Sequence, residues 1–470
     1  MRLYRQLRQH ILSGSLAPGD RLPSARMFAR DLGISRNTVE AAFAQLVEEG
    51  FVERRVGAGS VVTRSLAAVA PFLPLSTTAR KSSRAARLGP RGSRLAELGR
   101  VEVEADLAPG ACSTNAPGFP WQAWNRLLAR QARRGGVALL SSAPHQGIPE
   151  LRREIASYAR LTRGLRCSEE QVLVVNSTQQ AIDLAARLLL EPGDTALIEE
   201  PCYRSARGAF LAAGARVHGL PVDEEGLIAD ALERAPRGKL LYVTPSHQFP
   251  LGMTMSLPRR LALLRWAARR RAWIFEDDYD SEFCHDGRPI AALQALDTAD
   301  RVIYAGTFNK VLFPGLRLAY LIVPEALVEA FTAARRLIDG YSPPLPQAVL
   351  AEFMASGRFA SYLRQARQHF AACREALVDS VQQFWGGAVR LGPSSTGLHV
   401  VAHLPRGRDD RQLAACAAPG LGLAALSGYY FARQKPPGLL LSYGTATPAE
   451  IRAAVERLGS LLRSGTKTTR

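Results

Sequence analysis

The chain has 470 residues, of which 47% are hydrophobic and 22% are charged, and these values exclude a disordered or low-complexity chain. No run of about 18 apolar residues occurs, and the first residues lack the apolar core of a signal peptide, so we expect no membrane span and no secretion. The 6 cysteines are scattered without a Cys-x-x-Cys pair, which favours a cytoplasmic protein with reduced thiols and no metal site.

The formal net charge is +18, and it is distributed unevenly. Residues 1–63 carry 9 Arg and 6 acidic residues, whereas residues 64–100 carry 8 basic residues and a single Glu. A basic surplus favours a polyanionic partner such as DNA. An Arg-rich overall composition would give the same surplus, so charge alone leaves both interpretations open.

The first segment, residues 1–63, has the pattern of a winged helix-turn-helix. Apolar residues at helical spacing predict an amphipathic helix over Leu3–Ser13. Ser24 can cap a second helix that Gly33 ends, and Ser35 can cap a third helix, from Arg36 to Glu49. Residues 50–62 then predict a hairpin, or wing.

The third helix opens with short polar residues, and the start of a recognition helix faces base edges and phosphates. We expect Arg36 and Asn37 to reach base edges, and Ser35 and Thr38 to contact phosphate. Each of these residues alone could be an ordinary solvated side chain.

Residues 64–100 are rich in Ala, Ser, Pro, Gly and Arg without a sustained period, which predicts a basic flexible linker. Its charge could add sequence-independent attraction to DNA, or it could serve only as a solvated tether.

From residue 101 the chain alternates between helical and strand patterns, as a parallel α/β sheet requires. We expect one domain over 101–470. Its large part covers about 101–335, and a small C-terminal α+β subdomain covers about 336–470.

Two strand patterns within the large part end in chemically informative residues. One, Val302–Ala305, leads to Lys310, whose amine could form a Schiff base with an aldehyde cofactor, while Thr307 and Arg317 could hold a phosphate. The other begins at Trp273 and ends in carboxylates and a Tyr, which suit a pyridinium nitrogen and a ring hydroxyl. The pattern predicts pyridoxal 5'-phosphate at the carboxyl ends of parallel strands.

Three motifs, Thr244–Pro250, Glu276–Asp280 and Gly306–Lys310, together resemble the fold-type I aminotransferase domain of the MocR regulators. That family joins such a domain to an N-terminal winged helix of the GntR type, and the resemblance covers nearly the whole chain. It implies an α/β fold class: a winged helix-turn-helix followed by a fold-type I transferase domain with a small C-terminal subdomain.

The resemblance also implies individual roles. Lys310 would form the Schiff base, Asp277 rather than Asp278 would pair with the ring nitrogen, and Tyr279 would lie near the ring oxygen. The remaining cofactor residues would be the phosphate ligands Ser177, Thr178, Gln179, Thr307 and Arg317, with Tyr203 against the ring. On the DNA side, the GntR pattern adds Arg26 and Gly57 of the wing.

Several positions depart from the family pattern. Ser177 stands where Gly is usual, Asn309 replaces a Ser, and Phe249 replaces an Asn that bonds the ring oxygen in many fold-type I enzymes. His247 or Gln248 could take over that bond.

The most informative departure is Leu440, where the family usually has the Arg that binds a substrate carboxylate. An unpaired carboxylate in a desolvated site would cost several kcal/mol, on the order of the penalty for burying any unpaired charge. Either the effector lacks such a carboxylate, or Arg204 or Arg207 binds it, or the cofactor itself is the signal.

Two functions follow from these features. The chain could be a transcriptional regulator that binds a double-stranded DNA operator as a homodimer and senses an amine, an amino-acid-like effector or pyridoxal phosphate through the Lys310 imine. It could instead be an active aminotransferase with an accessory DNA-binding domain. The winged helix and Leu440 favour the regulator.

Overall fold

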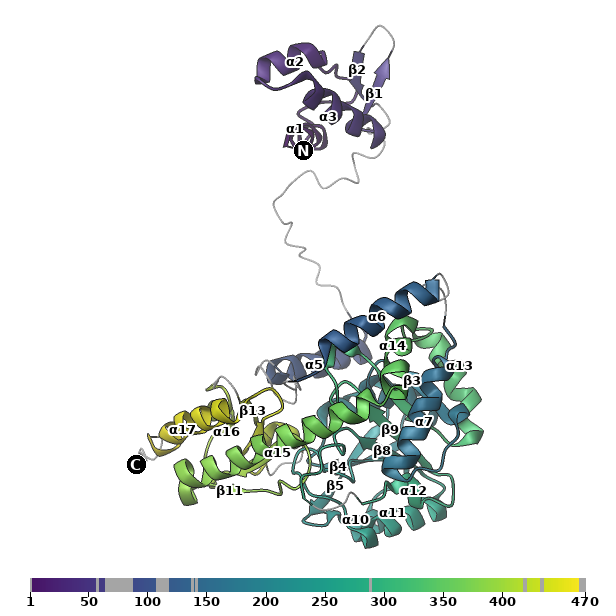
Figure 1. The fold of residues 1–470 in the computed structure, drawn as a ribbon, viewed down its shortest axis with the longest axis vertical. Helices are drawn as coiled ribbons and strands as arrows, with labels where there is room; N and C mark the ends of the chain where they lie inside the picture. Colours follow the sequence, from purple (N-terminus) through teal and green to yellow (C-terminus); the bar gives the residue numbers. More distant parts are fainter. Residues whose placement is uncertain are drawn as a thin grey trace. The chain divides into compact units, whose positions relative to one another are not determined.

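The computed structural model describes residues 2–55, 59–63, 88–106, 118–136, 139, 143–286, 290–416, 421–431 and 435–464. The chain divides into two compact units, Met1–Arg87 and Leu88–Arg470 (Figure 1). Within the described ranges, no helix combines the length and the apolar composition that crossing a bilayer requires.

The first unit is a winged helix-turn-helix, as the sequence predicts. Its elements are α1 (Arg2–Leu12), α2 (Ala25–Leu32), α3 (Arg36–Glu48) and an antiparallel hairpin of β1 (Val52–Arg55) and β2 (Gly59–Val62). The predicted caps are present, because the Ser24 and Ser35 hydroxyls accept backbone N–H groups and Gly33 takes the left-handed conformation. Val39, Phe43 and Leu46 of α3 lie in the small core, so its polar face remains outside.

The second unit is built on an eight-stranded sheet with the order β3-β10-β9-β8-β7-β4-β5-β6. The strands are β3 (Val172–Val175), β4 (Thr195–Glu200), β5 (Arg216–Asp223), β6 (Gly226–Leu227), β7 (Gly238–Val243), β8 (Trp273–Asp278), β9 (Val302–Thr307) and β10 (Ala319–Ile322). β10 is antiparallel to both of its neighbours, whereas β4, β5, β7, β8 and β9 are parallel. The predicted parallel α/β sheet is therefore confirmed, with antiparallel strands added to it.

Helices cover both faces of this sheet, because alternate residues of each strand point to opposite sides. Leu240 and Tyr242 of β7 pack with α8 (Thr178–Leu189), α9 (Arg204–Ala212) and α13 (Val328–Ile338). Leu241 and Val243 pack instead with α10 (Ala229–Arg234), α11 (Leu257–Arg270) and α12 (Leu293–Leu296). The β3 end of this second face is covered by α6 (Trp121–Gly135), α7 (Pro149–Arg163), α14 (Pro344–Ala355) and the start of α15 (Arg358–Trp385).

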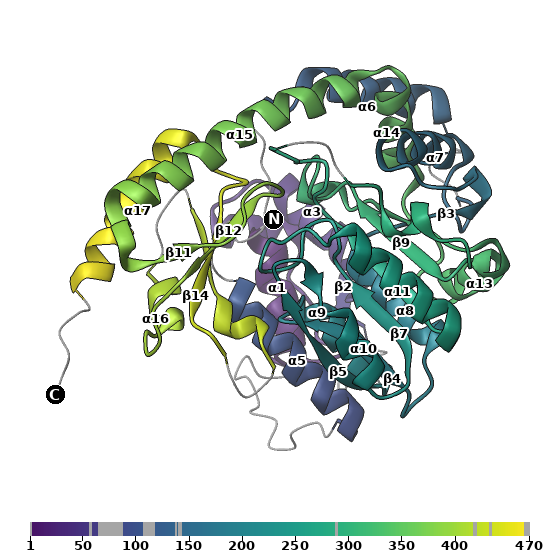
Figure 2. The same cartoon turned by 90° about the horizontal axis from the view of Figure 1, so that it is seen from below.

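The C-terminal subdomain has a four-stranded antiparallel sheet, in the order β11-β12-β14-β13. Its strands are β11 (Arg390–Leu391), β12 (His399–His403), β13 (Gly422–Ala425) and β14 (Gly438–Ser442), and its helices are α16 (Asp410–Ala414) and α17 (Pro448–Ser464). The long α15 runs from α14 to α17 and so joins this subdomain to the large part (Figure 2). Leu439 and Leu441 face the core beneath α15 and α17, whereas Leu440 points to the opposite face.

The predicted linker differs from the structure at its C-terminal end. Helix α5 (Pro90–Asp106) begins inside the stretch 64–100 and packs against α9. Residues 90–100 are therefore helical rather than flexible, because a run through Leu95 and Leu98 can form a helix that a composition rich in Ala, Gly and Arg obscures. The preceding residues, 64–87, lie outside the described ranges.

Gly306 of β9 offers a test of how tightly this strand packs against β10. It pairs with Tyr320 of β10, and a Cβ atom on Gly306 would lie only 2.4 Å from the Tyr320 ring carbon Cζ. We expect Gly306→Ala to lower the free energy of unfolding of the second unit by about 1–3 kcal/mol, because the ring must move out of a packed core. All 5 tryptophans belong to residues 121–385, so urea unfolding followed by tryptophan fluorescence reports on this unit.

Gly315→Ala is the matched control for this measurement. The nearest atom to a Cβ at Gly315 is 4.0 Å away, so we expect almost no change in its unfolding midpoint. Equal midpoints for the two variants would contradict the packing described for Gly306.

Candidate cofactor site and DNA interface

Strand pairing brings the predicted cofactor residues to one edge of the large sheet. Asp277 of β8 lies opposite Ala305 of β9, and Thr307 of β9 lies opposite Ala319 of β10. Ala319 in turn lies opposite Val175, the last residue of β3. The turn after β3, the lysine loop after β9 and the carboxylates of β8 are therefore neighbours, although up to 135 residues separate Val175 from Lys310 in the sequence.

Asp277 is buried and has one carboxylate oxygen in use. The Tyr242 hydroxyl donates to its Oδ2 at 2.7 Å, and Oδ1 has no hydrogen-bond partner among the described residues. Burial raises the pKa of Asp277 to about 7, although the Tyr242 bond and the charge of Lys310 oppose this shift. A protonated ring nitrogen would supply both the missing donor and a compensating charge, so the residue fits a pyridine cofactor.

The neighbouring Asp278 has a different environment. Its Oδ2 accepts from Arg163 Nε at 2.7 Å and from the Tyr304 hydroxyl at 2.6 Å, in a fully buried network. The charge of Asp278 is therefore neutralised by an Arg, whereas the nearby cation for Asp277 is Lys310. Asp278 Oδ1 also has no hydrogen-bond partner among the described residues, so the two carboxylates differ in the cation beside each.

Asn309 holds the loop that carries Lys310. Its side-chain amide donates to the Asn176 carbonyl at 3.2 Å, and its side-chain oxygen accepts from Leu318 N–H at 2.9 Å. Its own N–H donates to Thr307 Oγ1 at 3.1 Å. The sequence comparison suggested only a small substitution at this position, and the bridge from the end of β3 to the start of β10 was missed because it depends on distant segments.

Three of the predicted phosphate residues, Ser177, Thr178 and Gln179, lie at the N-terminus of α8. Ser177 caps the helix by accepting from Gln180 N–H at 3.2 Å, and Thr178 is its first residue. Gln179 donates to the Ser205 carbonyl at 3.1 Å, while its side-chain oxygen is buried without a partner in the described structure. Arg317, at the left-handed end of a short turn, is exposed. The helix terminus and this cation suit a phosphate.

Aromatic rings gather around Phe249, in the loop after β7. Phe249 contacts Tyr203, Tyr279 and Tyr429, with ring centroids 6.0, 5.8 and 5.2 Å away. Leu440 belongs to the same cluster and is only 1% exposed. It pairs with Val401 and Ala424, so the face of the small sheet that meets the site is apolar there.

The two candidate replacements for the missing Asn behave differently. The Gln248 amide donates to the carbonyls of Pro201 and Phe249, both at 2.9 Å, and thus supports the loop. His247 instead contacts Tyr279 and Asp280.

Arg204 and Arg207 lie over the rings of Tyr429 and Phe431, at 5.3 and 4.7 Å from the ring centroids. Arg204 therefore borders the aromatic cluster on its Tyr429 side, where a cation could meet an anionic group.

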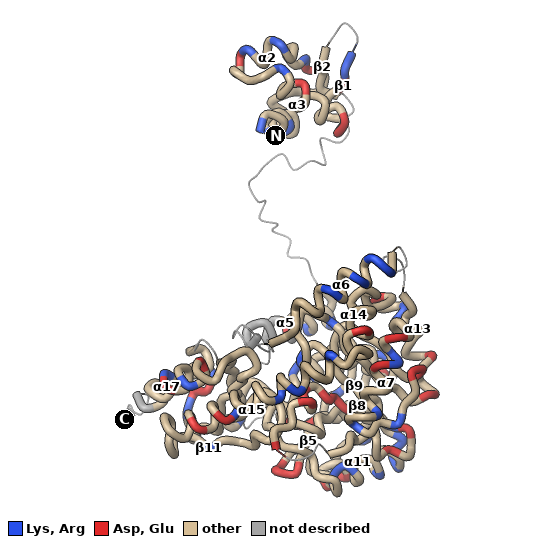
Figure 3. Tube along the Cα trace, viewed as in Figure 1, with Lys and Arg blue, Asp and Glu red and all other residues tan. Residues whose placement is uncertain are grey.

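The candidate DNA residues that the structure describes lie on the surface of the first unit. Those in the described ranges are Arg26, Ser35, Arg36, Asn37 and Thr38, and each is exposed, whereas Gly57 lies outside those ranges. Basic residues occur along α2 and β1 (Figure 3). The Arg36 guanidinium is 4.0 Å from Glu40, a weak exposed contact that leaves the side chain able to turn toward DNA.

Both units match known families. Residues 1–62 match the family described as bacterial regulatory proteins of the gntR family, and residues 106–458 match aminotransferase class I and II. The chain is 38% identical over 465 residues to the probable rhizopine catabolism regulatory protein MocR of Rhizobium meliloti, covering 97% of this chain and 92% of that protein. It is 29% identical to the pyridoxine biosynthesis regulator PdxR of Corynebacterium glutamicum, covering 98% and 96%.

Among solved structures, the second unit resembles LysN, an alpha-aminoadipate aminotransferase from Thermus thermophilus complexed with N-(5'-phosphopyridoxyl)-L-leucine. The sequence identity is 30%, the TM-score is 0.72, and the match covers 80% of this chain and 97% of that one. The predicted fold and cofactor are confirmed: this is a fold-type I domain, and its cofactor is pyridoxal 5'-phosphate.

Glu199 supports the loop 244–250 from β4 and should make stability depend on pH. Its carboxylate accepts from the N–H and the hydroxyl of Thr244, at 3.1 and 2.8 Å, and burial raises its pKa to about 7. The folded state thus binds a proton that the unfolded state has released, so stability is present at low pH and is lost as the pH rises through 7. From pH 6 to pH 8 this carboxylate should cost the fold about 1 kcal/mol.

We expect Glu199→Gln to remove this contribution, so that the loss of stability between pH 6 and pH 8 becomes smaller than in the wild type. Tryptophan-monitored urea unfolding at the two pH values, without cofactor, measures the difference. Parallel pH dependences for the two proteins would contradict the assignment.

Proposed function

Because this chain belongs to the MocR-type regulators of the GntR family, we propose that it senses an amine, an amino-acid-like effector or pyridoxal phosphate through Lys310 and so controls its binding to an operator. The proposal is carried by Asp277 Oδ1, which is buried beside the charge of Lys310 and has no hydrogen-bond partner among the described residues, in a chain that also exposes a recognition helix. Residues 1–63 would bind DNA, and residues 101–470 would bind cofactor and effector.

Pyridoxal phosphate supplies an electrophilic aldehyde carbon and an electron-withdrawing ring. Lys310 would offer the amine that bonds that carbon, Asp277 would keep the ring nitrogen protonated, and Tyr279 would donate to the ring oxygen. Tyr203 would lie against the ring. The phosphate would be held by Ser177, Thr178, Gln179, Thr307 and Arg317.

The apolar setting of Leu440 supports an effector without an α-carboxylate. No charge on this part of β14 could pair with such a group, since Leu440 packs between Val401 and Ala424. Burying an unpaired carboxylate there would cost several kcal/mol, on the order of the desolvation penalty of a charge. Arg204, over the Tyr429 ring, is the alternative partner for an anionic effector.

Steady aminotransferase activity is the second candidate. Its support is the likeness to LysN, which is an aminotransferase with 30% identity to this chain. Leu440 argues against efficient turnover of ordinary amino acids, because the carboxylate would lack the cation that holds it in a productive orientation.

On the DNA side, we propose that two copies form a homodimer whose winged helices read two half-sites. Arg36 and Asn37 would contact base edges, and Arg26, Ser35, Thr38 and Gly57 would contact the backbone. An effector would change the binding affinity only if it bound one arrangement of the dimer better than another.

The effector class can be tested with matched pairs of an amino acid and the amine left by its decarboxylation, such as phenylalanine and phenylethylamine. We expect the amine to change the visible absorption of the cofactor-loaded protein at concentrations at least about tenfold lower than the amino acid requires. This ratio corresponds to a difference of roughly 1.4 kcal/mol in binding free energy. Lys310→Ala should lose the wild-type band altogether. A preference for the amino acid would favour Arg204, and multiple turnovers with a keto acid acceptor would favour the enzyme.

The role of Arg36 can be tested on a DNA fragment that the wild-type protein protects in footprinting. We expect Arg36→Ala to weaken binding by about 1–3 kcal/mol and to reduce discrimination against mismatched fragments. Arg5→Ala removes the same charge from α1, which contacts the far end of α3 through Tyr4 and Glu49. It should weaken binding less and leave the discrimination unchanged. Equal effects of the two variants would count against α3 as the reading helix.

A further inference from the structure

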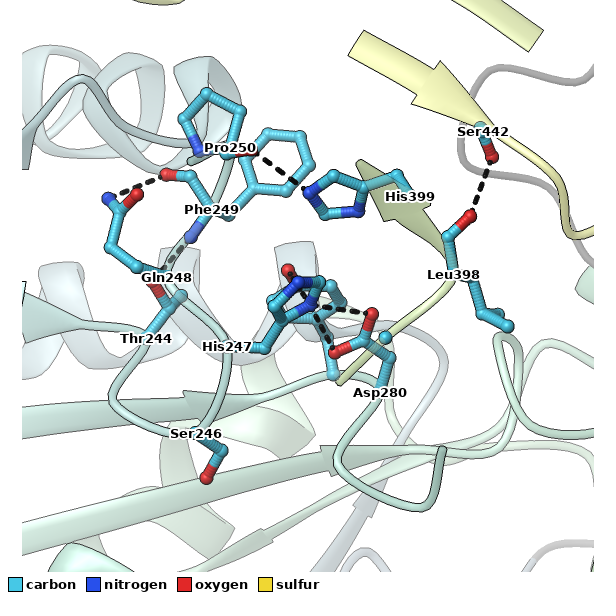
Figure 4. A network of polar contacts seen from close by, with 12 residues as sticks. Thr244, Ser246, His247, Gln248, Phe249, Pro250, Asp280, Leu398, His399 and Ser442 are labelled. Atoms are coloured by element: carbon cyan, nitrogen blue, oxygen red, sulfur yellow. Dashed lines mark hydrogen bonds and ion pairs between the residues drawn. The ribbon is translucent and has the colours of Figure 1, made fainter. Parts of the chain in front are cut away.

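A buried polar chain lies next to Tyr279. His247 Nδ1 is 3.0 Å from each carboxylate oxygen of Asp280 (Figure 4). It is also 3.0 Å from the Tyr279 hydroxyl. His247 and Asp280 are 1% and 2% exposed, so water does not compete for these bonds. Neither residue has a role in the function proposed above.

The chemistry of the three groups fixes the direction of the hydrogen bonds. An ionised carboxylate can only accept, so Nδ1 of His247 must carry the proton that faces Asp280. The Tyr279 oxygen, also 3.0 Å from Nδ1, shares this N–H as an acceptor, so the Tyr279 proton does not point at His247. The Nε2 atom of His247 has no hydrogen-bond partner among the described residues, which agrees with this tautomer.

A glycine of the C-terminal subdomain makes room for the pair. Gly397 has a φ of +84°, and a Cβ there would lie 2.2 Å from His247 Nδ1 and 2.5 Å from Asp280 Oδ2. Its carbonyl accepts from the Tyr443 hydroxyl at 2.7 Å, and its N–H donates to the Phe283 carbonyl at 2.8 Å. The loop before β12 is therefore held against the His247–Asp280 pair.

We propose that Asp280 and His247 are positioning residues that orient the Tyr279 hydroxyl toward the ring oxygen of the bound cofactor. The inference rests on the proposed role of Tyr279. A hydroxyl that donates to the ring oxygen stabilises the anionic form of that oxygen, and Asp280 acts on it only through His247 and Tyr279. The titratable groups in contact with His247 are Asp280, Tyr279 and His399, and the charge of Lys310 acts on both His399 and Asp277.

A metal site is the competing explanation, since His247, Asp280 and His399 offer ligand atoms within 4.8 Å of one another. Hydrogen bonds already occupy one ring nitrogen of each histidine and the carboxylate of Asp280. Nδ1 of His247 serves Asp280 and Tyr279, and His399 Nε2 donates to the Pro250 carbonyl at 3.0 Å. Binding an ion would break the contact between His247 and Asp280, so we favour the positioning role.

The test is a pH titration of the visible absorption of the cofactor-loaded, full-length protein. The wild type should show a band that titrates with a defined midpoint. Tyr279→Phe removes the donor, so the ring oxygen holds its proton more tightly and the midpoint should rise. Asp280→Asn should raise it in the same direction, by roughly half a pH unit or more, as a weakened hydrogen bond would. A direct effect of the lost negative charge would lower the midpoint instead.

The double variant Asp280→Asn/Tyr279→Phe shows whether Asp280 acts through Tyr279. Its midpoint should equal that of Tyr279→Phe, whereas a further rise would overturn the proposal. An unchanged or lowered midpoint in Asp280→Asn would also overturn it. So would a wild-type midpoint that moves with a chelator or with added Zn²⁺.

Two further results keep the test conclusive. If Asp280→Asn fails to fold, Gly397→Ala tests the same contact, because its Cβ would displace His247, and its midpoint should rise. If the wild type itself has no cofactor band, the proposed function fails and not only this inference.

Discussion

The buried carboxylate of Asp277, beside Lys310, is the interaction around which the cofactor site is arranged. Asp277 is 5% exposed at the end of β8, and burial raises its pKa to about 7. Without a cation the site carries an unfavourable charge, and Lys310 relieves it only in part. A protonated ring nitrogen of the bound cofactor, as we propose, would complete the balance. The strand order, which places β8 and β9 side by side, therefore serves binding as much as folding, because it brings the two charges together.

Much of this arrangement could be predicted because its signals are local. The runs Trp273–Phe275 and Val302–Ala305 are apolar, as buried parallel strands require, and Ser24 and Ser35 cap the helices that they precede. The contacts that were missed are all long-range. Asn309 bridges to Asn176 across 133 residues, and His247 meets Asp280 across 33. No periodicity within one segment encodes such pairs, and helix α5 was missed because composition outweighed its weak pattern.

The departure at Leu440 shows how a site can lose a charge without losing its fold. β14 alternates, so Leu439 and Leu441 hold the subdomain core while the side chain between them faces the cofactor region. A change at that one position leaves both hydrophobic layers intact. Ligand specificity can then evolve separately from stability, because the residues of β14 that face the core differ from the residue that faces the site.

The C-terminal subdomain meets the site at two places, and this bears on how an effector could act. Leu440 packs in the cluster of Phe249 and Tyr279, and Gly397 lies against the His247–Asp280 pair. Both positions are connected through the same small sheet, because β12 begins two residues after Gly397 and pairs with β14, which contains Leu440. A ligand that pushes on Leu440 would therefore also move the loop that holds His247 in place. Densely packed interfaces shift as units rather than deforming gradually. Ligand binding at Leu440 and the hydrogen bonds of His247 would therefore depend on each other.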